Sequence, residues 1–159
     1  MGNPNVRVEQ ANCVDASEIA SRMRYEDCRE ALDLAGLDPR SAIEASLMAS
    51  RGSGKAYIGY VDDTPEIIFG VGQSNTIGVG HPWLLATDGI NKVPFSFTRN
   101  TLRYVAEFQE VFPILTNIVD ARNELHLQWL ERMGFTFIKE WTNMGPGRIV
   151  AKQFILVRK

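Results

Sequence analysis

The spacing of hydrophobic residues along this chain switches several times between two periods. Stretches in which apolar and polar residues alternate, or in which apolar residues run together over a short length, predict strands. Stretches in which apolar residues recur every three or four positions predict helices. The pattern predicts, in order, strand 5–10, helices 16–35 and 39–51, strands 55–61, 66–72 and 81–87, a helix over 94–112, strand 114–119, a helix after 123, and strands 135–141 and 149–157.

Capping and turn residues separate these predicted elements. Asp15 is expected to cap the first long helix, which allows a break near residues 23–25, and Gly36 is expected to end it. Asp38 and Pro39 suit the cap and the first position of the next helix. We expect loops or turns at 62–65, 73–80 and 88–93. Helices that interrupt the strands indicate a mixed α/β layer structure with parallel and antiparallel pairing.

Composition narrows the class of protein. The 159 residues suffice for one domain, residues 1–159, and the net charge of −2 gives no reason to expect a nucleic-acid partner. No apolar run approaches the roughly 20 residues that span a membrane, and the amino end carries no hydrophobic signal segment, so we expect a cytoplasmic protein. Cys13 and Cys28 lie in no metal-binding pattern, and we expect free thiols and no metal site.

The stretch VDARNELHLQWLERMGFTF, residues 119–137, joins the end of an apolar strand, Asn123, a helix and Gly134-Phe135. With the order of the elements, it resembles the Gcn5-related N-acetyltransferase (GNAT) fold, which has an Asn and a later Gly-Phe in this place. The resemblance implies an α/β (mixed α+β) fold of three layers. Its central sheet would be mixed and mostly antiparallel, with helices on both faces, and strand 81–87 would splay away from strand 114–119.

A narrower likeness extends over most of the chain. The segments ALDLAGLDPRSAIEASLMAS, IIFGVGQS, GHPWLLATD and NIVDARNELHLQWLERMGF are similar to the phage acetyltransferase-like family that includes internal virion protein A of short-tailed phages. This resemblance implies a phage or prophage source, and hence the host cytoplasm or the virion. It implies a fold without guaranteeing a reaction, because function belongs to the site.

The GNAT resemblance also implies acetyl-CoA as cofactor. Its pantetheine arm would lie along the edge of strand 81–87, and its pyrophosphate would lie at the start of the helix that follows. The expected cofactor-binding residues are Leu85, Ala86, Thr87, Gly89, Lys92, Thr98, Arg99, Asn123 and His126. The family's glycine-rich phosphate loop is replaced here by DGINKVP. Alternatives stay open: 88–93 as a solvated connection, Asn123 as a helix cap, and His126 as a partly exposed histidine on a helix face.

Acyl transfer also needs groups that carry protons. The candidate bases are Glu66, His81 and Asp120, with Asp88 beside them, and each also suits a structural role. Leu130 stands where the family commonly has a tyrosine that protonates the leaving thiolate. A leucine cannot supply that proton.

Two functions follow from these residues. The first is an acetyl-CoA-dependent N-acetyltransferase that acts on a small-molecule or protein amine. The second is a non-catalytic phage protein of the same fold, which serves in virion assembly or binds a phage or host protein. A homo-oligomer is compatible with either. The altered phosphate loop and Leu130 favour the second, whereas Asn123, Gly134-Phe135 and the expected strand opening favour the first.

Overall fold

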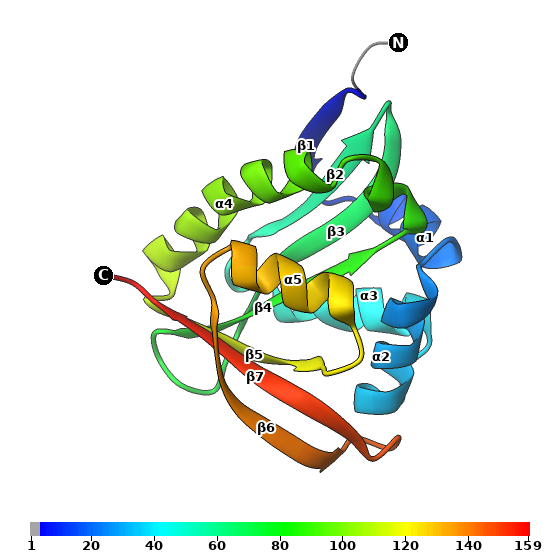
Figure 1. Ribbon diagram of the computed structural model, residues 1–159. Helices are drawn as coiled ribbons and strands as arrows, with labels where there is room; N and C mark the ends of the chain where they lie inside the picture. Colours follow the sequence, from blue (N-terminus) through cyan, green and yellow to red (C-terminus); the bar gives the residue numbers. More distant parts are fainter. Residues whose placement is uncertain (1–3) are drawn as a thin grey trace.

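The computed structural model describes residues 4–159, apart from the side chains of residues 94 and 95. The protein consists of one seven-stranded sheet with helices on both faces (Figure 1). The strands lie in the order β1-β2-β3-β4-β5-β7-β6. In chain order the elements are β1 Val6–Gln10, α1 Cys13–Ser21, α2 Tyr25–Ala35, α3 Pro39–Ala49, β2 Ala56–Val61, β3 Thr64–Gln73, β4 Val79–Ala86, the 3₁₀ helix η1 Asp88–Lys92, α4 Pro94–Val111, β5 Ile114–Asp120, α5 Glu124–Arg132, β6 Thr136–Met144 and β7 Ile149–Val157.

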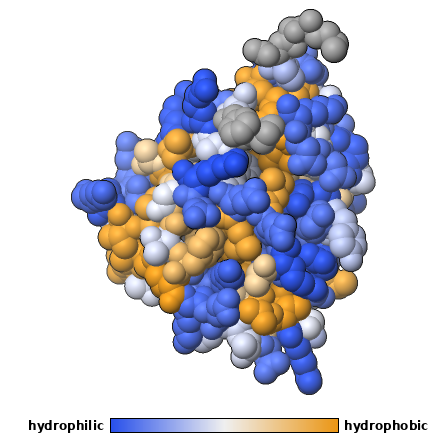
Figure 2. Space-filling view, in the orientation of Figure 1, coloured by the Kyte–Doolittle hydropathy of each residue, from blue (hydrophilic) through white to orange (hydrophobic). Residues whose placement is uncertain are grey.

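The sheet is mixed and mostly antiparallel, as predicted, with β4 and β5 as its parallel neighbours. One buried apolar cluster joins α1 and α3 to the sheet, and α2 lies on the same side. A second cluster joins α4 and α5 to the opposite face. On the face that α4 and α5 form, apolar patches lie among polar residues (Figure 2). No helix within residues 4–159 is long and apolar enough to cross a membrane.

Several predicted turn and cap residues act as expected. Gly36 ends α2 in the left-handed conformation, with a φ of +68°. The side chain of Asp38 accepts a hydrogen bond from the Ser41 N–H at 2.7 Å, and Pro39 occupies the first turn of α3. Asp62 also has a positive φ, in the tight hairpin between β2 and β3.

Other local predictions were wrong or incomplete. The cap of the first helix is Asn12, whose side chain accepts from the Asp15 N–H at 2.9 Å, so Asp15 lies inside the first turn. The 16–35 stretch is two helices, and the break allowed near 23–25 is confirmed. Strands β3 and β4 extend into both ends of the predicted 73–80 loop, because their ladder continues to the pair Gln73 and Gly80. The predicted 88–93 loop contains η1.

Strands β4 and β5 part soon after they meet, as predicted. They pair only through Val79 with Ile114 and Gly80 with Leu115. The ladder with β3 includes a bond from the Thr87 N–H to the Glu66 carbonyl, so even-numbered β4 residues direct their backbone groups toward β5. Pro82 is the next such residue and has no N–H to donate, which ends the parallel ladder.

Polar side chains hold the point where the strands part. The Asn117 side chain donates through Nδ2 to the Pro82 carbonyl at 3.0 Å and accepts from the Ile118 N–H at 2.9 Å. His81 Nδ1 lies 2.7 Å from the Thr116 carbonyl oxygen. These contacts replace backbone bonds that the separated strands can no longer make with each other.

The substitution Asn117→Asp tests this bridge. A carboxylate still accepts from Ile118 but cannot donate to Pro82, so the free energy of unfolding should fall by about 1–3 kcal/mol at neutral pH. Acidification restores a donor to the new side chain, and the deficit should therefore narrow as the pH falls. Urea denaturation measures both effects, with Asn100→Asp on the exposed face of α4 as the matched control. Equal losses in the two variants would show that the bridge contributes nothing.

Candidate functional site

A pocket of about 400 Å³ opens where β4 and β5 separate, and it has walls on both faces of the sheet. On one face it is lined from α4 and α5, including Thr101, His126, Trp129 and Leu130. On the other face it is lined from α2 and α3. We call it the splay pocket.

One piece of backbone remains open along the β4 edge of this pocket. The alternation of the β3–β4 ladder directs the N–H and carbonyl of Leu84 toward β5, as it does for Ala86. The N–H and carbonyl of Ala86 are hydrogen-bonded to Asp27 and Arg24. The pairing of β4 with β5 ends at Gly80, before it reaches Leu84. Among the described residues, no hydrogen-bond partner stands opposite Leu84. This edge can pair with an extended chain that carries amide groups.

Helix α2 closes the far end of the opening. Asp27 Oδ2 accepts from the Ala86 N–H at 2.9 Å, and the Arg24 N–H donates to the Ala86 carbonyl at 2.9 Å. Across the gap, Glu30 Oε1 accepts from the Asp120 N–H at 2.7 Å. Two side chains of α2 and the backbone N–H of its N-cap residue thus replace the ladder that both strands lack at their carboxyl ends.

A buried polar cluster anchors α2 to the start of α5. Arg24 Nη1 donates to Asp27 Oδ1 at 2.7 Å and to Asn123 Oδ1 at 3.0 Å. The Asn123 amide donates to Asp27 Oδ1 at 3.0 Å, and His126 Nε2 lies 3.1 Å from the same oxygen. Asp27 and Asn123 have no exposed surface, and His126 is 6% exposed.

These contacts correct two alternatives that the sequence left open. Asn123 occupies the N-cap position of α5, but its side chain makes no capping hydrogen bond and binds Arg24 and Asp27 instead. His126 is buried beside Asp27 of α2 rather than partly exposed on the helix face.

The buried cluster shifts the affinities of its members for protons. Burial acts to raise the pKa of Asp27, but His126 and the Arg24 guanidinium outweigh it and hold that pKa below its usual value. Burial acts to lower the pKa of His126, yet the Asp27 carboxylate beside it raises that pKa above its usual value. For Glu30, burial prevails and raises the pKa. The raised pKa of His126 and the lowered pKa of Asp27 both favour the charged forms of this pair.

The predicted cofactor-binding residues are not all brought together. Leu85 and His126 line the splay pocket, and Ala86, Thr87 and Asn123 are buried near it. Gly89 and Lys92 line a second pocket of about 380 Å³ at the β2–β3 hairpin. Thr98 and Arg99 lie in the second turn of α4 and line neither pocket.

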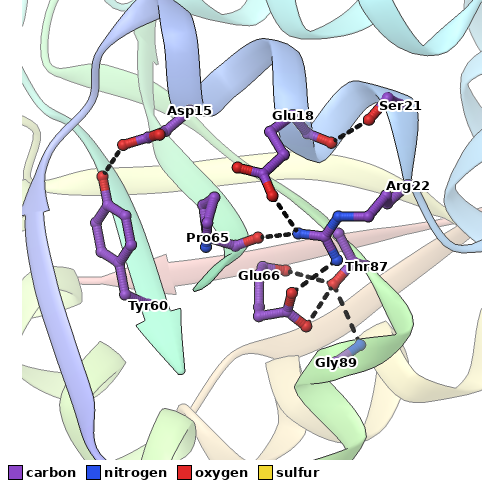
Figure 3. Close-up of polar contacts among 9 residues, drawn as sticks. All are labelled: Asp15, Glu18, Ser21, Arg22, Tyr60, Pro65, Glu66, Thr87 and Gly89. Carbon is purple, nitrogen blue, oxygen red and sulfur yellow. Dashed lines mark hydrogen bonds and ion pairs between the residues drawn. The ribbon is translucent and has the colours of Figure 1, made fainter. Parts of the chain in front are cut away.

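Glu66 lies in the second pocket, within a hydrogen-bonded group (Figure 3). Arg22 Nη1 donates to Glu66 Oε1 at 2.8 Å, and the Thr87 hydroxyl donates to Glu66 Oε2 at 2.9 Å. The Gly89 N–H already donates to the Thr87 hydroxyl at 3.1 Å. A Cβ at Gly89 would lie 1.0 Å from Glu66 Oε2, so this glycine makes room for the carboxylate.

The other candidate bases also have distinct surroundings. His81 lines the splay pocket at the point where the strands part. Asp120 is buried and accepts from the Arg122 backbone N–H at 2.9 Å and from its guanidinium at 2.8 Å. Burial acts to raise the pKa of Asp120, but Arg122 outweighs it and lowers that pKa. Asp88 is exposed in the second pocket.

Sequence reasoning missed Arg24, Asp27 and Glu30. They follow one another at intervals of three, which places them along one face of α2. Such a row of charges on a helix usually faces water. The packing of α2 against β4 and β5 is what brings the Asp27 and Glu30 carboxylates to the strand edges and buries Arg24 beside Asp27.

The ion pair predicts the titration of His126. Its imidazole should titrate above the usual value near 6.5 in proton NMR, with His81→Gln leaving one histidine signal for assignment. Because the folded state raises this pKa, protonation of His126 stabilises the fold fully below 6.5, and the gain is lost as pH rises through the folded-state pKa. The advantage of the natural chain over His126→Gln in free energy of unfolding should shrink across that window. A titration below 6.5 would contradict the pair.

Comparison with known proteins establishes the fold. No protein-family model matches the sequence, and no curated protein matches it. Among solved structures, yncA, a putative acetyltransferase from Salmonella typhimurium with its cofactor acetyl-CoA, superposes with a TM-score of 0.73 at 12% identity, over 97% of this chain and 94% of that one. An N-acetyltransferase from Staphylococcus aureus Mu50 gives 0.73 at 12%, over 98% and 99%. A GNAT-family acetyltransferase from Streptococcus pneumoniae gives 0.67 at 10%, over 98% and 100%. The chain has the fold of the GNAT acetyltransferases.

Proposed function

We propose that this protein binds acetyl-CoA in the splay pocket and transfers the acetyl group to an amine. The observation that carries the proposal is the early parting of β4 and β5, which leaves the backbone of Leu84 open beside a pocket that reaches both faces of the sheet. A neighbour with this fold, yncA, is described with acetyl-CoA as its cofactor.

The residues present suit the two ends of such a cofactor. A pantetheine arm carries amides that can pair with the N–H and carbonyl of Leu84, and the pocket walls around it are largely apolar. Helix α4 starts without a side-chain cap and with no acidic residue in its first turn, so its free N–H groups favour an anion. Lys92 and Arg99, both exposed, flank that start and remain the proposed partners of the pyrophosphate.

The proton chemistry is assigned to groups that line the pocket. When bound, acetyl-CoA supplies a thioester whose carbonyl carbon is open to attack by an amine. An ammonium must release one proton before its nitrogen attacks and a second as the amide forms, and one of these ends on the departing sulfur. Among the described residues, the titratable side chains that line the pocket are Glu30, His81 and His126. Leu130 also lines it and can donate nothing.

A second candidate is a non-catalytic role in virion assembly or in binding a phage or host protein. One observation favours it: Arg24, Asp27 and Glu30 already occupy the strand edges at the far end of the splay. A protein of this kind would bind no acetyl-CoA, or would bind it without releasing free thiol in the presence of amines.

Calorimetry with acetyl-CoA separates these functions. We expect saturable heat, and a free energy of unfolding that rises by about 2.7 kcal/mol when the ligand stands at a hundred times its dissociation constant. Incubation with a panel of amines should then release free thiol. Absence of binding at millimolar acetyl-CoA would remove the proposal, and binding without thiol release would favour the second candidate.

The open backbone of Leu84 allows a sharper test of the binding mode. Leu84→Pro removes the N–H that faces the splay and leaves the β3 side of the ladder intact, as Pro82 does two residues earlier. Leu84→Ala removes the same side chain and keeps the N–H. Acetyl-CoA should bind the proline variant about tenfold more weakly than the alanine variant. Equal affinities would mean that the arm does not pair with this residue.

A further inference from the structure

We infer that the acceptor is a small monoamine with an apolar body, whose ammonium group binds Glu30 in a groove between α2, α3 and the sheet. We call this part of the splay pocket the acceptor groove. The inference rests on the proposed transferase function, for which it specifies the class of substrate. The residues of the groove carry it.

Small apolar side chains form the walls of the acceptor groove. Helix α2 contributes Ala31 and Leu34, and α3 contributes Ala42, Ala45 and Ala49. The space between the helices exists because these positions carry so little side chain. Walls of this kind favour an apolar ligand body and leave the hydrogen bonds of a polar one unmade.

The polar groups in these walls are already engaged. The Ser46 hydroxyl donates to the Ala42 carbonyl within α3 at 2.8 Å. The indole N–H of Trp83 donates to the Ser50 hydroxyl at 2.7 Å. Neither donor is free for a ligand, so the groove offers apolar contact along these sides.

Glu30 is the acidic side chain among the described residues that line the splay pocket. Its Oε1 accepts from the Asp120 N–H, and its Oε2 makes no hydrogen bond to any described residue. Asp27, one turn earlier, has both carboxylate oxygens engaged with Ala86, Arg24 and Asn123. The two carboxylates of α2 thus differ: Asp27 is held in place, and Glu30 keeps one oxygen for a donor.

Glu30 also lies close to the open part of β4. Leu84 and Glu30 both line the splay pocket, and Glu30 binds the Asp120 N–H at the end of β5. A cation at Glu30 is therefore near the backbone that we propose for the cofactor arm. Burial raises the pKa of Glu30, and a bound ammonium would offset that cost by pairing with the charged carboxylate.

The size and charge of the site limit the ligand to one amine group. The whole splay pocket of about 400 Å³ lies at the low end of the range for small-molecule sites. A second ammonium, or the polar backbone of a peptide, would lose its water against alanine walls without gaining a partner. An aromatic or branched aliphatic primary amine is small enough for the pocket and carries only one ammonium group.

The test measures direct binding of three probes by ligand-observed NMR, with and without coenzyme A. The probes are 2-phenylethylamine, its uncharged counterpart 2-phenylethanol, and the hydrophilic polyamine spermidine. 2-Phenylethylamine should bind about tenfold more tightly than either of the others. Glu30→Gln should abolish its advantage over 2-phenylethanol, whereas Glu44→Gln, an exposed carboxylate of α3 outside the pocket, should not.

A second pair of variants tests the groove itself. Ala45→Phe fills the groove from an exposed position and should weaken both phenyl probes about tenfold, while Met48→Phe, exposed on the same helix outside the pocket, should leave them unchanged. Coenzyme A should bind the control variants Glu44→Gln and Met48→Phe as it binds the natural chain.

The outcomes separate this inference from the proposed function. If acetyl-CoA binds and yields thiol with spermidine or a peptide as readily as with 2-phenylethylamine, the inference is overturned and the transferase stands. If no probe binds with or without coenzyme A, or if Glu30→Gln keeps the preference for the ammonium, the inference is also overturned. If the amine binds as expected and acetyl-CoA does not bind at all, the transferase proposal falls.

Discussion

The need of every buried backbone polar group for a partner governs the centre of this molecule. Two parallel strands that part soon after they meet leave a row of N–H and carbonyl groups without partners on the other strand. Here Pro82 lacks an N–H at the point where the strands part. The Asn117 side chain binds the Pro82 carbonyl on β4 and the Ile118 N–H on β5. Helix α2 supplies Asp27 and Glu30 to the ends of the two strands. Leu84 remains between these positions, and this bounded gap is the basis of the proposed binding site.

The main effect of the buried cluster of Arg24, Asp27 and His126 is to hold α2 and α5 in place rather than to stabilise the fold. Taking such charges out of water is costly, and their mutual attraction repays this only when the remaining hydrogen bonds are satisfied. Asn123 satisfies part of the cluster by donating to Asp27 and accepting from Arg24. The cluster links α2 on one face of the sheet to α5 on the other, through the opening between β4 and β5. It therefore fixes both walls of the pocket relative to each other.

Much of the fold was predictable because local chemistry decided it. The strand and helix order, the Gly36 and Asp38-Pro39 signals and the parting of the strands followed from short-range pattern and from the resemblance at residues 119–137. Asp15 was mistaken for a cap because both it and Asn12 are good capping residues, and only the backbone shows which one precedes the helix.

The site was less predictable because its contacts join distant segments. Arg24 and Asn123 are separated by 99 residues, and Asp120 and Glu30 by 90. A charged residue on an amphipathic helix has the same appearance in sequence whether it meets water or a strand edge. Gly89 was likewise expected to bind the cofactor, whereas its missing side chain admits the Glu66 carboxylate. The burial of these groups depends on how α2 and the β2–β3 hairpin pack, which no local pattern encodes.

The start of α4, which lies outside the splay pocket, and the α2 side of that pocket carry charges of opposite sign, and this gives the proposed site a direction. On the α4 face, free N–H groups at an uncapped helix start lie between Lys92 and Arg99, so that face attracts an anion. On the α2 face, the acidic group that lines the pocket is Glu30, which attracts a cation and repels a phosphate. A phosphorylated cofactor and an ammonium acceptor would therefore approach from opposite faces and meet where the sheet is open. Exchanging the two would place each ligand beside charges of its own sign, so the distribution of charge orders the approach without any movement of the fold.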